Sequence, residues 1–168
     1  NFPKYIVVLS ATSTAVINVL INLCVVVIFA LISGISPSWS WLLVPLSLLE
    51  LYALALGVSL LLGAINVKFR DIGNIWDVLM QAMFYAIPII YPLSMVAERS
   101  ALAAKIILLN PIAQAIQDIR HNLITTQAET TWGELHFWAI IPIVMVVAVF
   151  IVSIFYFRRK SKYFAEEA

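Results

Sequence analysis

Charged residues are scarce in this sequence, and cysteine is nearly absent. Asp, Glu, Lys and Arg make up 11% of the 168 residues, whereas 63% are hydrophobic and the mean hydropathy is +1.01. A soluble domain of this length does not need so much apolar surface, so the composition indicates a membrane protein. Because Cys24 is the single cysteine, the chain has no disulfide framework and no thiolate metal site.

Sequence motifs of catalysis and nucleotide binding are also missing. The glycines are scattered, and no stretch matches a G-x-x-x-x-G-K-[ST] phosphate loop or an H-E-x-x-H zinc helix. His121 and His136 have no cysteine or carboxylate cluster around them, so we expect surface side chains rather than metal ligands. We expect no catalytic residue, metal or cofactor in this chain and no nucleic-acid partner; if the protein uses ATP, the ATP and Mg²⁺ bind a separate subunit.

Long apolar runs are abundant instead. Four runs can each cross a bilayer, because about 20 helical residues span a hydrocarbon core of ~30 Å. These runs lie at about 5–32, 41–65, 78–96 and 137–157. They lack the two-residue alternation of barrel strands, so the predicted fold class is all-α, a polytopic membrane helix bundle with residues 1–168 in one transmembrane domain. Pro88 and Pro92 are expected to kink or end the third run.

The basic residues predict the orientation of the bundle. If the N-terminus is cytoplasmic, seven of the ten Lys and Arg residues lie on the inner side, as the positive-inside rule favours. The C-terminus is then cytoplasmic as well, and four tryptophans fall at the outer interface: Trp39, Trp41, Trp132 and Trp138.

The charged turn "NVKFRDIGN", residues 66–74, lies on the cytoplasmic side in this orientation. A positive turn is expected in any multi-span protein, and this one carries Lys68, Arg70 and Asp71.

Two short helices are predicted on the outer side, at about 101–109 and 111–124. Asn110 is a typical N-cap, and Pro111 stands at the first helical position. The apolar residues after them recur at helical spacing, with polar residues on the other face, so we expect an amphipathic helix lying at the outer surface or re-entering it. The apolar set is Ile112, Ile116, Ile119 and Leu123, and the polar set is Gln117, Asp118, His121 and Asn122.

Several polar and aromatic residues fall inside the apolar runs. Glu50 lies near mid-membrane, where a carboxylate is costly, so it either faces a pore or bonds a neighbouring helix. A stripe of Ser10, Thr14, Asn18 and Asn22 lines a hydrated path or joins helices. Aromatic rings either stack on a sugar chain or simply pack. The candidate channel-lining residues are Asn18, Asn22, Glu50, Tyr52, Phe84 and Tyr85, and Tyr91 offers a further ring.

Three motifs in order resemble the membrane subunits of type-2 ABC exporters, in the branch that exports O-antigen, capsule and teichoic acid polysaccharides. The first is the Lys68-Phe69-Arg70-Asp71 turn, and the second is the Pro88, Tyr91 and Pro92 end of the third run. The third is the helix that Asn110 and Pro111 open and that ends near Arg120, and the final span closes with "FRRKSKYF". The resemblance covers essentially the whole chain.

This resemblance implies a permease that works as a homodimer with two cytoplasmic ABC ATPase subunits. Lys68, Arg70 and Asp71 of the cytoplasmic turn are then candidates for contact with the ATPase or with a phosphate group. Arg70 can bind a diphosphate through two hydrogen bonds, or it can pair with Asp71 and stiffen the turn. The implied substrate is a polysaccharide on an undecaprenyl-diphosphate carrier, and the implied location is the bacterial or archaeal cytoplasmic membrane, among its lipids. Such subunits have six spans, so we expect this chain to be the C-terminal two-thirds of one. The short outer helices then correspond to an outer gate, with Pro88, Tyr91, Pro92, Asn110, Pro111 and Arg120 as its candidate residues.

Two other functions stay open on the residues alone. Export of a drug, antibiotic or free lipid fits the same composition. An integral-membrane enzyme that acts on lipid carriers would need clustered acidic or histidine side chains at one face, and Glu50, Asp77 and Asp118 are dispersed along the chain.

Overall fold

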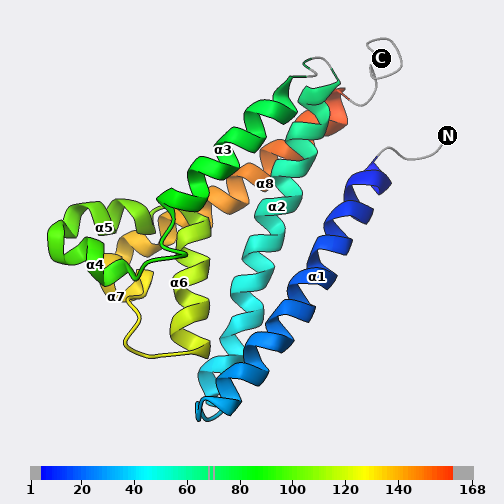
Figure 1. Cartoon of the computed structure of the whole chain (residues 1–168). Coiled ribbons are helices and arrows are strands. Elements are labelled where there is room, and N and C mark those ends of the chain that lie inside the picture. The colour runs from blue at the N-terminus through cyan, green and yellow to red at the C-terminus, as the bar shows by residue number, and fades with distance from the viewer. Residues whose placement is uncertain (1–4, 68, 70, 161–168) are drawn as a thin grey trace.

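The computed structural model describes residues 5–67, 69 and 71–160, and these residues are helical with no strand, as predicted (Figure 1). The elements are α1 (Tyr5–Ile32), the 3₁₀ turn η1 (Trp39–Leu43), α2 (Val44–Asn66), α3 (Ile72–Ala86), α4 (Leu93–Arg99), α5 (Ala101–Leu108), α6 (Pro111–Leu123), α7 (Thr131–Leu135), the 3₁₀ turn η2 (His136–Ala139) and α8 (Ile140–Lys160).

Three helical segments are long and apolar enough to cross a membrane: Val8–Ile32, Trp39–Asn66 and Thr131–Lys160. They correspond to the first, second and fourth predicted runs. The short pair α5 and α6 also forms where the sequence predicts it, and the two helices meet at a bend of 99°. The pair therefore has the geometry of a broken span or a re-entrant loop.

The third predicted run, 78–96, is divided at Pro88 and Pro92, as the two prolines predict, but its bounds are wrong. The structure places α3 earlier, at Ile72–Ala86, and a break separates it from α4. Ile87, before Pro88, has extended backbone with φ −86° and ψ 141°, as expected for a residue that precedes proline. With 15 residues, α3 is about 22 Å long, which is shorter than a ~30 Å hydrocarbon core.

The turn after α1 explains why α2 comes back beside it. Gly34 has a φ of 84°, which glycine adopts without steric cost. Its N–H donates to the Leu31 carbonyl oxygen at 3.1 Å, and the Ile35 N–H donates to that of Ala30 at 3.0 Å. This is the Schellman pattern, which ends a helix and turns the chain.

The most extensive helix contact joins α2 and α8. A Cβ atom added at Gly57 of α2 would lie 3.1 Å from the Cα atom of Phe150 in α8, so the two backbones approach because position 57 has no side chain. The beginning of α1, the end of α2 and the end of α8 lie at one end of the bundle, and η1 lies at the other (Figure 1).

A separate apolar cluster stands to one side of this bundle, where α4, α5 and α7 gather (Figure 1). Its buried members are Leu93, Ala104, Leu108, Leu135 and Ala139. This cluster supports the bend from which α6 starts.

Candidate functional site

The candidate site is built on α6, whose start is defined by its N-cap. The Asn110 Oδ1 atom accepts a hydrogen bond from the Ile112 N–H at 2.9 Å, and Pro111 is buried at the first helical position. Both features agree with the sequence prediction. From this start α6 runs alongside α2 toward η1, and this course favours re-entry over a position flat on the surface (Figure 1).

The polar face of α6 points into the protein. Gln114 and Gln117 are each 1% exposed, and Asp118 and His121 are partly buried. These four residues follow the spacing i, i+3, i+4 and i+7, which places them on one face of a helix. An amphipathic helix lying in the interface would turn such a face to water, so that alternative is not what the structure shows.

Asp118 is the centre of this polar face. The Gln114 side chain and the Thr131 backbone N–H are its hydrogen-bond donors, and His121 is a nearby titratable group. Glu50 of α2 lies close enough for its charge and that of Asp118 to repel. Glu50, which the sequence places near mid-membrane, therefore faces α6. Gln114 and Thr131 also belong to this polar cluster, although the sequence analysis did not predict them.

Several buried polar atoms in and beside this cluster have no hydrogen-bond partner in the described part of the chain. They are Glu50 Oε1, Gln114 Oε1, Gln117 Nε2, Glu129 Oε2 and Thr131 Oγ1. Each such atom costs about 1–3 kcal/mol when it stays unpaired. The cluster therefore holds α6 against α2 less firmly than a fully bonded network would.

Glu129 belongs to the loop between α6 and α7. Burial, together with the nearby charge of Glu134, raises the pKa of the Glu129 carboxyl above its ordinary value. In the same loop, the backbone carbonyl oxygen of Ala128 accepts a hydrogen bond from His121 Nδ1 at 2.8 Å. The loop thus ties back to the polar face of α6.

The end of α6 is held by two further bonds to distant segments. Arg120 Nη2 donates to the carbonyl oxygen of Ile89 at 3.2 Å, which links α6 to the break after α3. Ser40 Oγ in η1 donates to the carbonyl oxygen of Asn122 at 2.9 Å. Within the break, the Tyr91 hydroxyl donates to the carbonyl oxygen of Ala86 at 3.1 Å.

These contacts bring most of the predicted outer-gate residues together. Tyr91 and Arg120 act on the same break, and Asn110 and Pro111 begin the helix that carries Arg120. Pro88 is buried in the break, and Pro92 is the N-cap of α4. Their role in gating stays a prediction.

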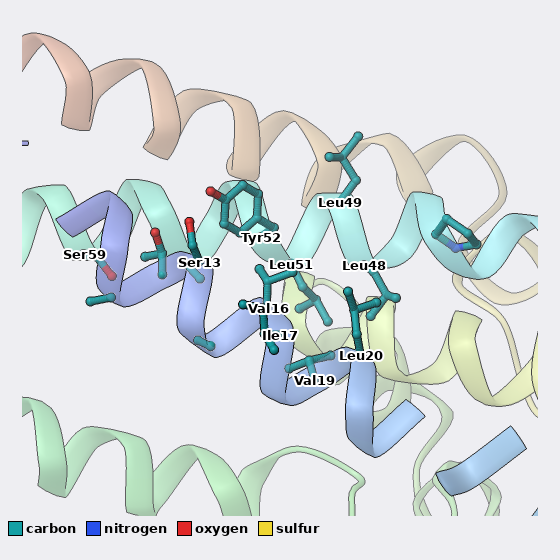
Figure 2. Close-up of a pocket in the computed structure, with 15 residues that line it drawn as sticks. Ser13, Val16, Ile17, Val19, Leu20, Leu48, Leu49, Leu51, Tyr52 and Ser59 are labelled. Carbon is teal, nitrogen blue, oxygen red and sulfur yellow. The ribbon is translucent and has the colours of Figure 1, made fainter. Parts of the chain in front are cut away.

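The predicted channel-lining residues, in contrast, are dispersed. A groove of about 810 Å³ lies between α1 and α2, and Tyr52 lines it with Ser13 and Ser59 (Figure 2). Asn18 and Asn22 are exposed and lie outside the lining of this groove. Phe84 and Tyr85 form an edge-to-face pair on α3, with ring centroids 5.5 Å apart.

The predicted cytoplasmic turn is described only in part. Lys68 and Arg70 lie outside the described residues. Asp71 is exposed and occupies the N-cap position of α3, without a capping hydrogen bond from its side chain. The pairing of Arg70 with Asp71 stays a prediction.

Residues 1–124 match the family described as ABC-2 type transporter, which covers α1 through α6. The chain belongs to this membrane family. It is 31% identical over 112 residues to the O-antigen export system permease protein RfbA of Myxococcus xanthus, and 31% identical over 116 residues to a protein of the same name from Klebsiella pneumoniae. These alignments cover 67% and 68% of this chain but 43% and 44% of the two relatives, so the chain matches less than half of their length. The family resemblance inferred from the motifs is thereby confirmed.

Proposed function

We propose that the chain is the membrane-spanning part of an ATP-driven exporter that carries a polysaccharide across the bacterial or archaeal cytoplasmic membrane. The observation that carries this proposal is the similarity over two thirds of the chain to permeases named for O-antigen export. The supporting structural feature is the bent α5 and α6 pair, in which the end of α6 is bonded to η1 and to the break after α3.

The finer parts of the proposal concern the assembly. Two copies of the permease form the path, and two cytoplasmic ABC ATPase subunits supply the energy. The substrate is a polysaccharide linked to undecaprenyl diphosphate. The end of α8, which carries Arg158, Arg159 and Lys160, faces the cytoplasm, since basic residues favour that side.

In the proposed mechanism α6 is the moving element. Opening breaks the Ser40 to Asn122 and Arg120 to Ile89 bonds at its far end and shifts its polar face along α2. The unpaired atoms of that face then find new partners, which lowers the cost of the open state. Hydroxyl groups of a sugar chain both donate and accept hydrogen bonds, and they suit such a surface.

The function is tested by depleting the full-length protein in its own cell and extracting lipid-linked glycans. We expect a long undecaprenyl-linked polymer to accumulate on the cytoplasmic side while the surface glycan disappears. Unchanged glycans would overturn the polysaccharide assignment and favour export of a drug, antibiotic or free lipid.

The moving helix is tested with cysteines at positions 40 and 122, in a Cys24→Ser background. These positions are joined by a 2.9 Å hydrogen bond, so a short cross-linker can bridge them. We expect the cross-linked permease to lose export and to regain it when a reducible linker is cleaved. The two single-cysteine variants serve as controls, and normal export by the cross-linked protein would contradict a gating role for α6.

A further inference from the structure

Helix α3 carries a polar stripe along one face. The stripe consists of Asn74, Asp77, Gln81 and Tyr85, which follow the spacing i, i+3, i+7 and i+11 and therefore share one side of the helix. All four residues are exposed. From its first residue to its last the stripe is about 16 Å long, because a helix rises 1.5 Å per residue.

The stripe lies at membrane depth. α3 starts at the end of the bundle where α2 ends, and it runs back beside α2, with which it is in contact (Figure 1). α2 belongs to a segment that is long and apolar enough to cross a membrane. The headgroup region on one side of a bilayer is about 5–8 Å thick, so a stripe of about 16 Å reaches into the hydrocarbon depth.

The polar stripe faces away from the described bundle. The partly buried residues of α3 are Ile72, Trp76 and Met83, which follow the spacing i, i+4 and i+11 and so mark the face that packs. This packed face is offset from the stripe by two residues, which is about half a helical turn. The described protein therefore covers an apolar side of α3 and leaves its polar side open, the reverse of what it does with α6.

The carboxylate of Asp77 limits what can cover the stripe. Lipid is disfavoured, because a charged side chain in the hydrocarbon region is costly. A dry contact between two copies of α3 would bring two Asp77 carboxylates together, and α3 has no Lys or Arg with which to neutralise them. Water, in contrast, solvates the carboxylate and the neighbouring amide groups. The stripe therefore fits a water-filled path.

We propose that the stripe borders the path between the two permease copies and that Asp77 makes this path selective for a neutral polysaccharide. This inference rests on the proposed function. Asn74 and Gln81 each donate and accept hydrogen bonds, as sugar hydroxyl groups do. Asp77 is the single charged residue of α3 and occurs once in each copy. A polymer that carries phosphate or uronic acid groups would be repelled there, because charges interact strongly in a narrow path with low-dielectric walls.

The path is tested by the reactivity of single cysteines in the full-length permease in membranes, with its native cysteines replaced. The variants are Asn74→Cys and Gln81→Cys, and the probes are a cationic and an anionic methanethiosulfonate of similar size. We expect both positions to react and the cationic reagent to react about tenfold faster, relative to the ratio for a free thiol in solution. Adding Asp77→Asn is expected to abolish this preference.

Matched controls come from the exposed apolar flank of the same helix. Ile75 and Leu79 are 62% and 47% exposed but lie outside the polar stripe, so Ile75→Cys and Leu79→Cys are expected to contact lipid or the second copy and to stay unreactive. Labelling after denaturation confirms that each cysteine is present. Unreactive cysteines at 74 and 81 would show that protein covers the stripe and would overturn the inference. Equal rates for the two reagents would overturn the selectivity.

The substrate class is tested by chemical analysis of the surface glycan that disappears when the full-length protein is depleted. We expect a polymer of neutral sugars, without phosphate or uronic acid groups in its repeat. Loss of an anionic glycan would overturn the selectivity for neutral polymers and leave the proposed polysaccharide export standing. Unchanged glycans would overturn the proposed function itself, so the two failures are distinguishable.

Discussion

Helices α1 and α6 are opposite in composition and in burial. α1 is among the most apolar segments of the chain, yet only 6% of its most apolar stretch of 18 residues is buried within the protein. α6 is polar on one face, and Gln114 and Gln117 on that face are 1% exposed. In a bilayer, lipid covers apolar side chains as well as protein does, so apolar character alone does not bring two helices together. Polar side chains inside the membrane favour contact with protein, and on α6 they mark the face that packs.

The short helix α3 resembles α1 in this respect. None of its described residues is buried, and its aromatic residues Phe84 and Tyr85 are exposed. The packed parts of the described chain are therefore α2 with α6 and α8, and the separate cluster of α4, α5 and α7. We expect the open faces of α1 and α3 to contact lipid or the second permease copy of the proposed homodimer.

The largest expected effect on stability comes from replacing a glycine by leucine. Gly57 lies in the packed helix α2, and Gly73 lies in the open helix α3. Gly57→Leu forces atoms against the Phe150 backbone, where a Cβ atom alone would already be 3.1 Å from Cα, and we expect a loss of about 3 kcal/mol in the free energy of unfolding. Gly73→Leu in α3 meets no atom within 4 Å at its Cβ, and we expect a change within about 0.5 kcal/mol. Unfolding of the purified protein by SDS titration measures both. Equal losses would show that α3 is packed as closely as α2.

The sequence predicts the helices of both regions better than it predicts their packing. The length of the apolar runs is enough to predict α1, α2 and α8. Asn110 and Pro111 are enough to predict where α6 begins. The bounds of the third run were wrong because its apolar length extends past Pro88, but the prolines correctly predict that the helix ends there.

The burial of the polar face of α6 could not be predicted, because a helix pattern shows that two faces differ but not which face meets protein. The spacing of Gln114, Gln117, Asp118 and His121 was the available signal. Thr131 had no signal, since it reaches Asp118 through its backbone N–H from the loop side. Contact between Glu50 and α6 likewise depends on tertiary structure.

Replacing a polar side chain by leucine is expected to lower the free energy of unfolding more in α6 than in α1, by an intermediate amount. Gln114→Leu removes a hydrogen-bond donor from Asp118 at a buried position, and we expect the free energy of unfolding to fall by about 2 kcal/mol. Asn18→Leu on α1 replaces an exposed polar side chain by an apolar one, with an expected change within about 0.5 kcal/mol. The same SDS titration compares them. A stable Gln114→Leu variant beside an unstable Asn18→Leu variant would reverse the contrast between α6 and α1.

The smallest expected effect uses one substitution, asparagine to alanine, in both helices. Asn110→Ala removes the N-cap bond to the Ile112 N–H, and we expect a loss of about 1 kcal/mol. Asn22→Ala lies in the interior of α1 at an exposed position, where alanine has the higher helix propensity, so we expect a gain of about 0.5 kcal/mol. Thermal unfolding in lipid nanodiscs resolves the two signs. If Asn22→Ala also destabilises the protein, Asn22 bonds a neighbour outside this chain, and α1 is then packed by a partner through its polar stripe.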